Sequence, residues 1–447
     1  MKREMMVAMS LCCLLFCTHS LEAKRSAYWP TFRGPVNTGV APDANPPVAW
    51  SESENIKWKV QLPGKGSSSP VIWGDRIFFL TAIPAETAEE EKPAAPPEAQ
   101  TRQDPPPDPG DEQGQRRGRM SQPPTSAHTF DVVCLDRESG RMLWQKTVKE
   151  ELPHEGHHRD ASFASYSPVT DGKFVWASFG SRGLYCFDLD GTLKWSQDLV
   201  RQRTRAGFGE GSSPVIAGDA IVVVADHEDQ SYIYAFDKLS GRPLWKKERD
   251  EASSWATPIA VDVAGQTQVI ANGRNFVRGY DLKTGEVLWK CSGQTENVIP
   301  TPVVGFGMVY CASGFRGSAL QAIELGKTGD LTGTDAVRWQ VNEATPYVPS
   351  PILIKDKLYF CSNSKAIISC YQAEDGKANF TRQVLEGPKG IYASPVGAAG
   401  RVYFAGRNGV TVVVKVSDTY EVLATNTLDD GFDATPAIVG DEIYLKG

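Results

Sequence analysis

One short phrase, Ser or Thr followed by Pro and then a small or apolar residue, occurs eight times along the chain. The phrases are Ser69-Pro70-Val71, Ser167-Pro168-Val169, Ser213-Pro214-Val215, Thr257-Pro258-Ile259, Thr301-Pro302-Val303, Ser350-Pro351-Ile352, Ser394-Pro395-Val396 and Thr435-Pro436-Ala437. Successive prolines are 98, 46, 44, 44, 49, 44 and 41 residues apart. A period near 44 residues is typical of the four-stranded blades of a β-propeller. The phrase therefore predicts an all-β chain of eight blades.

Each repeat continues in the same order, with a tight turn, an apolar strand, a loop, a second strand, an acidic turn ending in Gly, and a Trp. The first turns are Gly74-Asp75, Asp171-Gly172, Gly218-Asp219, Lys355-Asp356 and Gly440-Asp441. The tryptophans are Trp144, Trp195, Trp245, Trp289 and Trp339, replaced by Phe380 and Leu423 in later repeats. Gly-Asp turns between apolar strands are typical of β-hairpins.

A single sheet of about 40 residues cannot bury both of its faces, whereas a ring of sheets buries each sheet against its neighbours. A Trp at a fixed position in each repeat would supply contact area between neighbouring blades. The alternative is a row of tryptophans that stacks on a ligand. We expect the packing role.

The propeller is expected to span residues 50–447. Trp58, in Lys57-Trp58-Lys59-Val60, resembles an outer-strand Trp but precedes the first phrase, and the last repeat holds two strands. We therefore expect the N-terminal strand to complete the outer edge of blade eight and close the ring. A third strand is still lacking after Tyr444, so either the sequence is truncated or the eighth blade is short.

The composition changes abruptly between residues 84 and 128, where ten of the 30 prolines lie. A stretch so rich in proline and charge cannot bury enough apolar surface to fold. We expect a disordered insert between the second and third strands of blade one. Recognition of a partner by its proline-rich or arginine-rich pieces is the less favoured interpretation.

The N-terminus has the layout of a secretory signal peptide, with Lys2 and Arg3 before an apolar stretch from Met5 to Cys17 and a small residue at Ala23. We expect residues 1–23 to be removed and residues 24–49 to form a lead segment. A membrane anchor or a lipidated cysteine is a minority alternative. The predicted location is exported, either periplasmic or at the cell surface.

The charge balance argues against one class of partner. The 54 acidic and 47 basic side chains give a net charge of −7. Nucleic-acid binders need a surplus of Lys and Arg to neutralise phosphates. No apolar run is long enough to span a bilayer after the leader is cleaved. We therefore expect neither a nucleic-acid partner nor a transmembrane segment.

Six cysteines follow the leader, and none has the spacing of a zinc site or a redox motif. They are Cys134, Cys186, Cys291, Cys311, Cys361 and Cys370. Their apolar contexts predict buried, unpaired side chains. Cys361 and Cys370 flank one expected hairpin and are the one pair that could form a disulfide.

The repeat, as in the segment from Asp237 to Trp245, resembles the pyrroloquinoline-quinone (PQQ) repeat of quinoprotein-like propellers over nearly all of residues 50–447. The opening Trp29-Pro30-x-Phe32-Arg33-Gly34-Pro35 is similar to that of exported PQQ-like repeat proteins of unassigned function. Two groups share the repeat. Outer-membrane assembly-factor lipoproteins (BamB-like) are scaffolds without a cofactor, and quinoprotein dehydrogenases bind PQQ and calcium.

The resemblance to the dehydrogenases implies a vicinal disulfide over the quinone, a calcium site and a catalytic Asp. In this sequence the adjacent cysteines, Cys12 and Cys13, lie in the leader. The calcium set and the base cannot be placed by motif. We therefore expect no cofactor and no catalysis, with a PQQ- and calcium-dependent dehydrogenase of alcohols or sugars as the alternative.

Loops that precede each phrase, and loops between second and third strands, should meet around a central funnel, which is the default ligand site. Four of these loops contain an arginine beside glycine, namely Arg182, Arg274, Arg316 and Arg407, and Lys365 lies in a fifth. Converging guanidinium groups would favour a carboxylate or phosphate ligand. The alternative is that each pairs with its own or a neighbouring loop.

The segment from His154 to Asp160 is dense in metal-ligating side chains, and His154, His157, His158 and Asp160 could bind zinc or copper. A solvated or hydrogen-bonded loop is the more common outcome. Asp226-His227-Glu228-Asp229 could hold calcium, but ion pairing with arginines is favoured. Gly207-Phe208-Gly209-Glu210-Gly211 lacks the helix of a phosphate loop.

Together these patterns predict an exported PQQ-like repeat propeller that serves as a binding or assembly scaffold. Its partner would be an envelope or extracellular protein, or a small anionic ligand.

Overall fold

The computed structural model describes residues 28–85, 124–362 and 364–447. The predicted leader and most of the predicted insert lie outside these residues. The insert nevertheless has the expected place in the chain, because β3 (Arg76–Pro84) and β4 (His128–Asp136) are paired neighbours on either side of it.

The described residues form antiparallel sheets and almost no helix, as the repeat predicts. Sheet 1 contains β1 (Tyr28–Trp29), β2 (Val71–Trp73), β3, β4 and β5 (Met142–Glu151). Sheet 2 contains β6 (Val169–Thr170), β7 (Phe174–Ser178), β8 (Leu184–Asp188) and β9 (Leu193–Gln197). Sheet 3 contains β10 (Val215–Ala217), β11 (Ala220–Ala225), β12 (Ser231–Asp237) and β13 (Pro243–Arg249).

Sheets 4 and 5 are linked by an extra strand. Sheet 4 contains β14 (Ile259–Val263), β15 (Gln266–Ala271), β16 (Val277–Asp281) and β17 (Val287–Cys291). Sheet 5 contains β18 (Val303–Gly305), β19 (Met308–Ser313), β20 (Ala319–Glu324) and β22 (Val337–Val341). The loop before β22 carries β21 (Gly329–Asp330), which pairs in parallel with β17 and covers the outer edge of sheet 4.

The remaining sheets continue the pattern until the last one. Sheet 6 contains β23 (Ile352–Ile354), β24 (Lys357–Cys361), β25 (Ile367–Gln372) and β26 (Ala378–Val384). Sheet 7 contains β27 (Val396–Ala398), β28 (Arg401–Ala405), β29 (Val410–Lys415) and β30 (Val422–Thr427). Sheet 8 contains β31 (Ala437–Val439) and β32 (Glu442–Tyr444). Two short 3-10 turns, η1 (Gly180–Arg182) and η2 (Arg205–Gly207), complete the regular elements.

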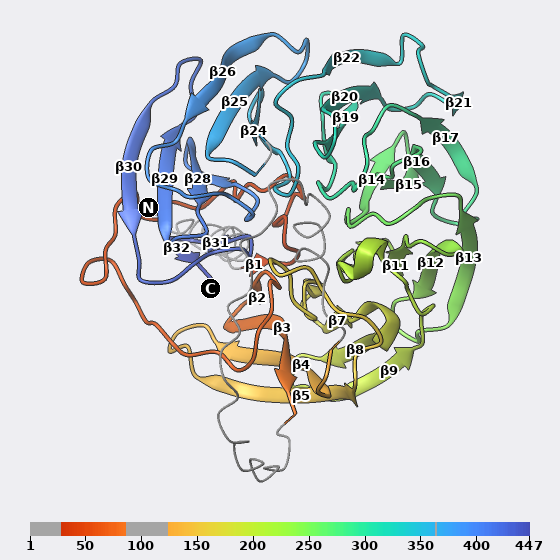
Figure 1. Ribbon diagram of the computed structural model, residues 1–447, viewed down its shortest axis with the longest axis vertical. Helices are drawn as coiled ribbons and strands as arrows, with labels where there is room; N and C mark the ends of the chain where they lie inside the picture. Colours follow the sequence, from red (N-terminus) through yellow and green to blue (C-terminus); the bar gives the residue numbers. More distant parts are fainter. Residues whose placement is uncertain (1–27, 86–123, 363) are drawn as a thin grey trace, which may run out of the picture.

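The sheets are arranged around a common centre, and the outer strands of sheets 1 to 7 lie at the periphery (Figure 1). The apolar core is correspondingly divided into clusters between neighbouring sheets. Phe130 of sheet 1 shares a cluster with Phe179, which follows β7 within sheet 2, and Tyr310 of sheet 5 shares one with Phe360 of sheet 6. Burial between sheets, which the repeat predicted, is therefore the main packing interaction.

The Ser and Thr hydroxyls of the repeated phrases hydrogen-bond from one sheet to the next. In each link the backbone N–H of one phrase donates to the hydroxyl of the following phrase, at 2.9–3.1 Å. Seven such links occur, and one of them runs from the Thr435 N–H to Ser69, joining the last phrase to the first. The hydroxyl thus satisfies a buried N–H before seven of the eight inner strands, which explains why Ser or Thr precedes the proline.

The rim tryptophans pack on the next sheet. The indole N–H of Trp245 donates to the Leu282 carbonyl at 2.8 Å, and its ring covers Gly285, where a Cβ would lie 2.7 Å from the ring. Trp144, Trp195 and Trp339 have the same relation to Gly191, Gly241 and Gly376. The predicted packing role is confirmed for these four. Trp289 differs, because its indole N–H donates to Gln268 of its own sheet.

The N-terminal strand predicted around Trp58 does not form, and residues 56–62 have no ladder partner. A cavity of about 1170 Å³, lined by this segment and by β32, lies where such a partner would be needed. Trp58 still occupies the expected position, since it donates to the Arg137 carbonyl at 3.0 Å and covers Gly140.

The lead segment crosses between distant sheets, which the sequence analysis did not predict. β1 pairs with β2, whereas Gly39 and Ala41 hydrogen-bond to Gly397 in β27. Arg33 is fully buried and donates to the carbonyls of Pro395 and Pro351 at 3.1 and 2.6 Å. Burial lowers the pKa of Arg33 to about 9. The segment therefore ties sheet 1 to sheets 6 and 7.

Candidate functional site

The loops that precede the repeated phrases, together with the loops between second and third strands, carry three clusters of charged side chains. We name them the Glu210 hub, the Asp160 cluster and the Glu296 cluster, after the carboxylate of each. Their members come from neighbouring sheets, so each cluster tests whether the predicted funnel residues converge.

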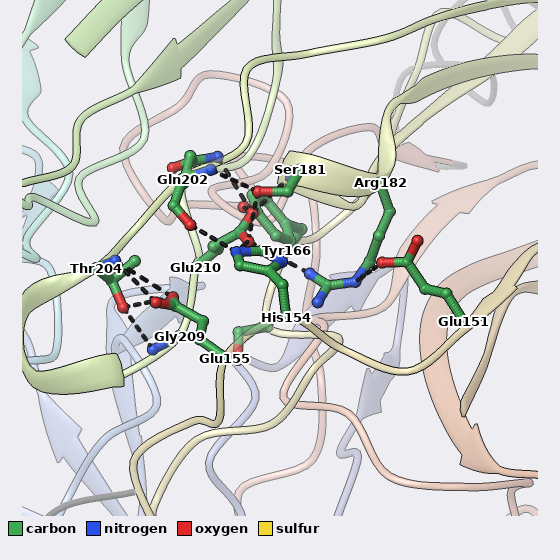
Figure 2. Close-up of polar contacts among 12 residues, drawn as sticks. Glu151, His154, Glu155, Tyr166, Ser181, Arg182, Gln202, Thr204, Gly209 and Glu210 are labelled. Carbon is green, nitrogen blue, oxygen red and sulfur yellow. Dashed lines mark hydrogen bonds and ion pairs between the residues drawn. The ribbon is translucent and has the colours of Figure 1, made fainter. Parts of the chain in front are cut away.

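The Glu210 hub is built around a carboxylate whose side chain is only 3% exposed (Figure 2). Glu210 accepts hydrogen bonds from the Tyr166 hydroxyl at 3.0 Å, from the Ser181 N–H and hydroxyl at 2.7 Å each, and from Gln202 at 3.2 Å. The guanidinium of Arg182 donates to it at 3.3 Å. Five donors thus surround one carboxylate, and its charge is compensated where it lies.

Local backbone geometry positions the donors of this hub. Gly180 has a φ of +58°, and a Cβ there would lie 1.8 Å from the Glu210 carboxylate. Glycine at this position therefore allows both the turn of η1 and the close approach of Glu210. Burial raises the pKa of the Tyr166 hydroxyl well above its usual value, so it remains a donor at neutral pH.

Two further residues of the hub bear on the predicted metal site. His154 Nε2 lies 3.8 Å from Glu210 and 2.6 Å from the Gln202 carbonyl, while Glu155 accepts from the Thr204 N–H and hydroxyl. Among the described residues, His154, Glu155 and Glu210 can bring three metal-ligating atoms within 4.8 Å of one another. Burial raises the pKa of Glu155. Arg182 already supplies positive charge to Glu210, which disfavours a cation there.

The other predicted metal ligands lie elsewhere. His157 Nδ1 faces the His158 carbonyl at 2.8 Å, and His158 Nδ1 is 3.6 Å from Asp160. Of the four residues in the prediction, His158 and Asp160 are brought together, whereas His154 lies in the Glu210 hub. Metal binding remains a prediction, and the described donors favour His154 with Glu155 over the original set.

The Asp160 cluster joins distant parts of the chain. Arg407 donates to Asp160 at 3.1 Å and to Asp433 at 2.7 Å, and its guanidinium lies 4.1 Å from the ring centre of Tyr392. Burial alone would raise the pKa of Asp160, but hydrogen bonding to Arg407 outweighs it and lowers the pKa. Arg407 is therefore paired with two carboxylates.

In the Glu296 cluster, arginines outnumber carboxylates. Arg205 donates to Glu296 at 2.6 Å, and the guanidiniums of Arg316 and Arg274 lie 3.5 and 3.6 Å from the same carboxylate. Two of these residues, Arg274 and Arg316, were predicted funnel ligands, whereas Arg205 was not. Three arginines thus share one acid.

The five basic residues predicted to line the funnel consequently separate. Arg182 belongs to the Glu210 hub and Arg407 to the Asp160 cluster, while Arg274 and Arg316 meet at Glu296. Lys365 is exposed and forms no ion pair within the described part of the chain. The missed residues Arg205 and Glu210 lie in the loop between β9 and β10, which has no repeat-wide pattern to mark it.

The acidic segment of sheet 3 forms ion pairs, as the sequence favoured. Asp226 makes two hydrogen bonds with the fully buried Arg249, at 2.7 and 3.0 Å, and Asp229 pairs with Arg203 at 2.7 Å. Hydrogen bonding to Arg203 lowers the pKa of Asp229. These carboxylates are committed to arginines in the structure.

The cysteines are buried and unpaired in the described structure. Strand register places Cys370 opposite Tyr359 and Cys361 opposite Ile368, so the possible disulfide between the two is not formed. Burial raises the pKa of both the Cys134 and the Cys370 thiols to about 12, which keeps them protonated. They act as apolar core side chains.

Comparison with known proteins places the chain in a family. The family described as outer membrane protein assembly factor BamB matches residues 128–382, which is more than half of the sequence. No curated protein matches this chain. No helix in the described residues has the length and apolar character needed to cross a membrane.

Two solved structures are similar to the chain at low sequence identity. The crystal structure of BamB from Moraxella catarrhalis is 14% identical, with a TM-score of 0.50, over 71% of this chain and 85% of that chain. A europium-containing methanol dehydrogenase is 11% identical, with a TM-score of 0.49, over 96% of this chain and 91% of that chain. The chain is therefore a PQQ-repeat β-propeller and belongs to the family described as outer membrane protein assembly factor BamB.

Proposed function

We propose that this protein is an exported, eight-bladed PQQ-like repeat propeller that acts as a binding or assembly scaffold in the cell envelope. The family match supports a protein partner, and the signal-peptide pattern at residues 1–23 supports export. The proposal has two parts, a closed ring and a non-catalytic loop face, and each is supported by its own contacts.

The hydrogen-bond links between the repeated phrases support the closed ring. They include the link from Thr435 to Ser69, which connects sheet 8 to sheet 1. Trp58 covers Gly140 as the other rim tryptophans cover their neighbours, so it takes the place of the outer-strand Trp of blade eight. Closure buries the sheet faces that an open array would expose to solvent at its two ends.

The observation that carries the scaffold role is the pairing of buried charges in the central loops. Glu210 with Arg182, and Asp226 with Arg249, are each hydrogen-bonded within the protein. Such pairs fix the loops relative to one another and leave these groups without free capacity for proton transfer. A rigid, preformed loop face favours docking of another protein with little loss of conformational entropy.

The residues present do not fit the quinone site that a dehydrogenase would need. The resemblance implies a vicinal disulfide above the quinone, but no two of the six described cysteines are adjacent, and all six are buried. The alternative function would therefore require a different way of holding PQQ.

Two measurements on the purified exported chain test the proposal. Addition of PQQ and calcium should produce neither bound quinone absorbance nor dye-linked alcohol oxidation, and turnover would overturn the scaffold role. Affinity capture from an envelope fraction should retain outer-membrane proteins. Arg159→Glu should reduce this capture because its side chain is 79% exposed beside the Asp160 cluster.

A matched control distinguishes the loop face from the rest of the surface. Leu239 is 60% exposed in the turn between β12 and β13, away from the central loops. Leu239→Ser should leave capture unchanged. Equal capture by wild type and Arg159→Glu would show that the loop face is not the docking surface.

A further inference from the structure

The Glu296 cluster holds more positive charge than its single carboxylate compensates. Arg205, Arg274 and Arg316 contribute three guanidinium groups, so the cluster carries a net charge of +2 with Glu296 ionised. Glu228 accepts a hydrogen bond from Ser253, which in turn accepts one from the Arg205 N–H, but Glu228 forms no ion pair with any of the three arginines in the described residues. The surplus charge distinguishes this cluster from the others in the central loops.

Two of the three arginines have unused donors. Arg274 and Arg316 approach Glu296 at 3.6 and 3.5 Å, and neither side chain makes a hydrogen bond within the described residues. Their side chains are 43% and 65% exposed. Each guanidinium has five N–H donors in a planar fork, so both can accept an external ligand without breaking an existing hydrogen bond.

Two of the arginines, Arg205 and Arg316, lie against an aromatic pair. The guanidiniums of Arg316 and Arg205 lie 5.3 and 6.0 Å from the ring centre of Phe315, which stacks on Tyr347 at 5.2 Å. Cation–π contact favours a defined position for each guanidinium. The donors are therefore partly preorganised, which reduces the entropy lost on ligand binding.

A buried amide side chain lies in the same cluster. Asn297 is 2% exposed, and its Oδ1 accepts from Arg205 at 3.1 Å, but its Nδ2 makes no hydrogen bond of good geometry. Its Nδ2 faces the Tyr347 hydroxyl, because a hydrogen bond from Asn297 opposes the rise that burial causes in the pKa of Tyr347. Asn297 therefore supports the Arg205 guanidinium from the buried side of the cluster.

We propose that Arg205, Arg274 and Arg316 form a binding site for a phosphoryl group, the terminal phosphate of a small molecule. A phosphate monoester carries nearly two negative charges and three terminal oxygens, which match the net charge of the cluster and its several donors. A carboxylate supplies one charge and two oxygens, and Glu296 already provides that. This inference goes beyond the scaffold role and does not depend on it.

Isothermal titration calorimetry with inorganic phosphate tests the site. The protein is titrated at pH 7.5, with ionic strength held constant by sodium chloride. We expect saturable binding that succinate, a dicarboxylate, does not match. If chloride and phosphate give the same response, or if no saturation occurs up to about 20 mM phosphate, the proposal is overturned.

Variants connect the binding to the cluster. Arg316→Ala should weaken phosphate binding about tenfold, because a charge-assisted hydrogen bond is lost. Glu296→Gln should tighten it about threefold, because a competing carboxylate is removed. Arg338→Ala is the matched control, since Arg338 is 55% exposed and pairs with Glu324 outside the cluster. Unchanged binding in Arg316→Ala, with the melting temperature of wild type, would overturn the proposal.

Discussion

Glu210 and Glu296 are both glutamates in central loops that precede a repeated phrase, yet their surroundings are opposite. Glu210 is 3% exposed and accepts hydrogen bonds from four side-chain or backbone groups and one arginine. Glu296 is 28% exposed and faces three arginines, of which one forms a hydrogen bond. The Glu210 carboxylate has its full set of hydrogen-bond donors. Around Glu296, by contrast, the three arginines have more donors than this one carboxylate can accept.

The difference indicates what each group contributes. Around Glu210 the donors and acceptors are balanced, so removal of the carboxylate leaves buried groups without partners. Around Glu296 the donors are in excess, so removal of the carboxylate leaves them accessible to solvent or to a ligand. The same side chain is therefore expected to stabilise the fold in one loop and to tune ligand binding in the other.

The largest expected effect is on stability at Glu210. Glu210→Gln should lower the free energy of unfolding by about 3 kcal/mol, because Arg182 and the Ser181 N–H lose a buried charged acceptor. Glu296→Gln should change it by less than about 0.5 kcal/mol, because an exposed ion pair contributes little. Urea denaturation at pH 7 measures both. Equal losses in the two variants would remove the distinction.

Much of the fold was predictable because the same sequence pattern recurs in every repeat. The Ser/Thr-Pro phrase predicted the sheets, and its hydroxyl proves to connect one inner strand to the next. The role of Arg33 was not predictable, since its acceptors Pro351 and Pro395 lie 318 and 362 residues away and a backbone carbonyl has no sequence signature. A segment that occurs once offers no periodicity to interpret.

The sequence predicted which loops carry the candidate site residues, but it did not predict which of these residues form ion pairs with one another. Arg274 and Arg316 were identified because they stand beside glycine in equivalent loops. Their common partner Glu296 could not be identified, because several acids lie in the central loops and ion pairing depends on side-chain direction. Arg205 was missed for the same reason, being 91 residues from Glu296 in sequence.

A smaller effect is expected from Glu155, which borders the Glu210 hub. Burial raises the pKa of Glu155, with Glu210 adding to the rise and hydrogen bonds from Thr204 opposing it. A carboxyl group with a raised folded-state pKa contributes stability below its unfolded pKa, and this contribution is lost as the pH rises through the folded-state pKa. The wild type should therefore lose stability relative to Glu155→Gln as the pH rises from about 4.3, the usual pKa of an unfolded-chain glutamate, towards neutrality. Urea denaturation of both proteins across this range measures the difference, and a difference that does not vary with pH would contradict the prediction.

The smallest expected effect is on anion affinity at Glu296, whose pKa is lowered first by its hydrogen bond to Arg205 and then by Arg274 and Arg316. As the pH falls through this lowered pKa, Glu296 takes up a proton and the cluster changes from a net charge of +2 to +3. Sulfate stays doubly charged under these conditions, so its binding should tighten by about twofold to fivefold as the pH falls below about 4.3, the usual pKa of a glutamate.

Glu296→Gln provides the control for this titration. The three arginines keep their charge across the range, Asn297 and Tyr347 stay neutral, and Glu228 accepts its hydrogen bonds from Ser253 rather than from the three guanidiniums. The variant should therefore bind sulfate with nearly constant affinity. Calorimetric titration at each pH measures both proteins. If the variant shows the same pH dependence as the wild type, another group controls the charge of the cluster, and the contrast between the two glutamates would rest on stability alone.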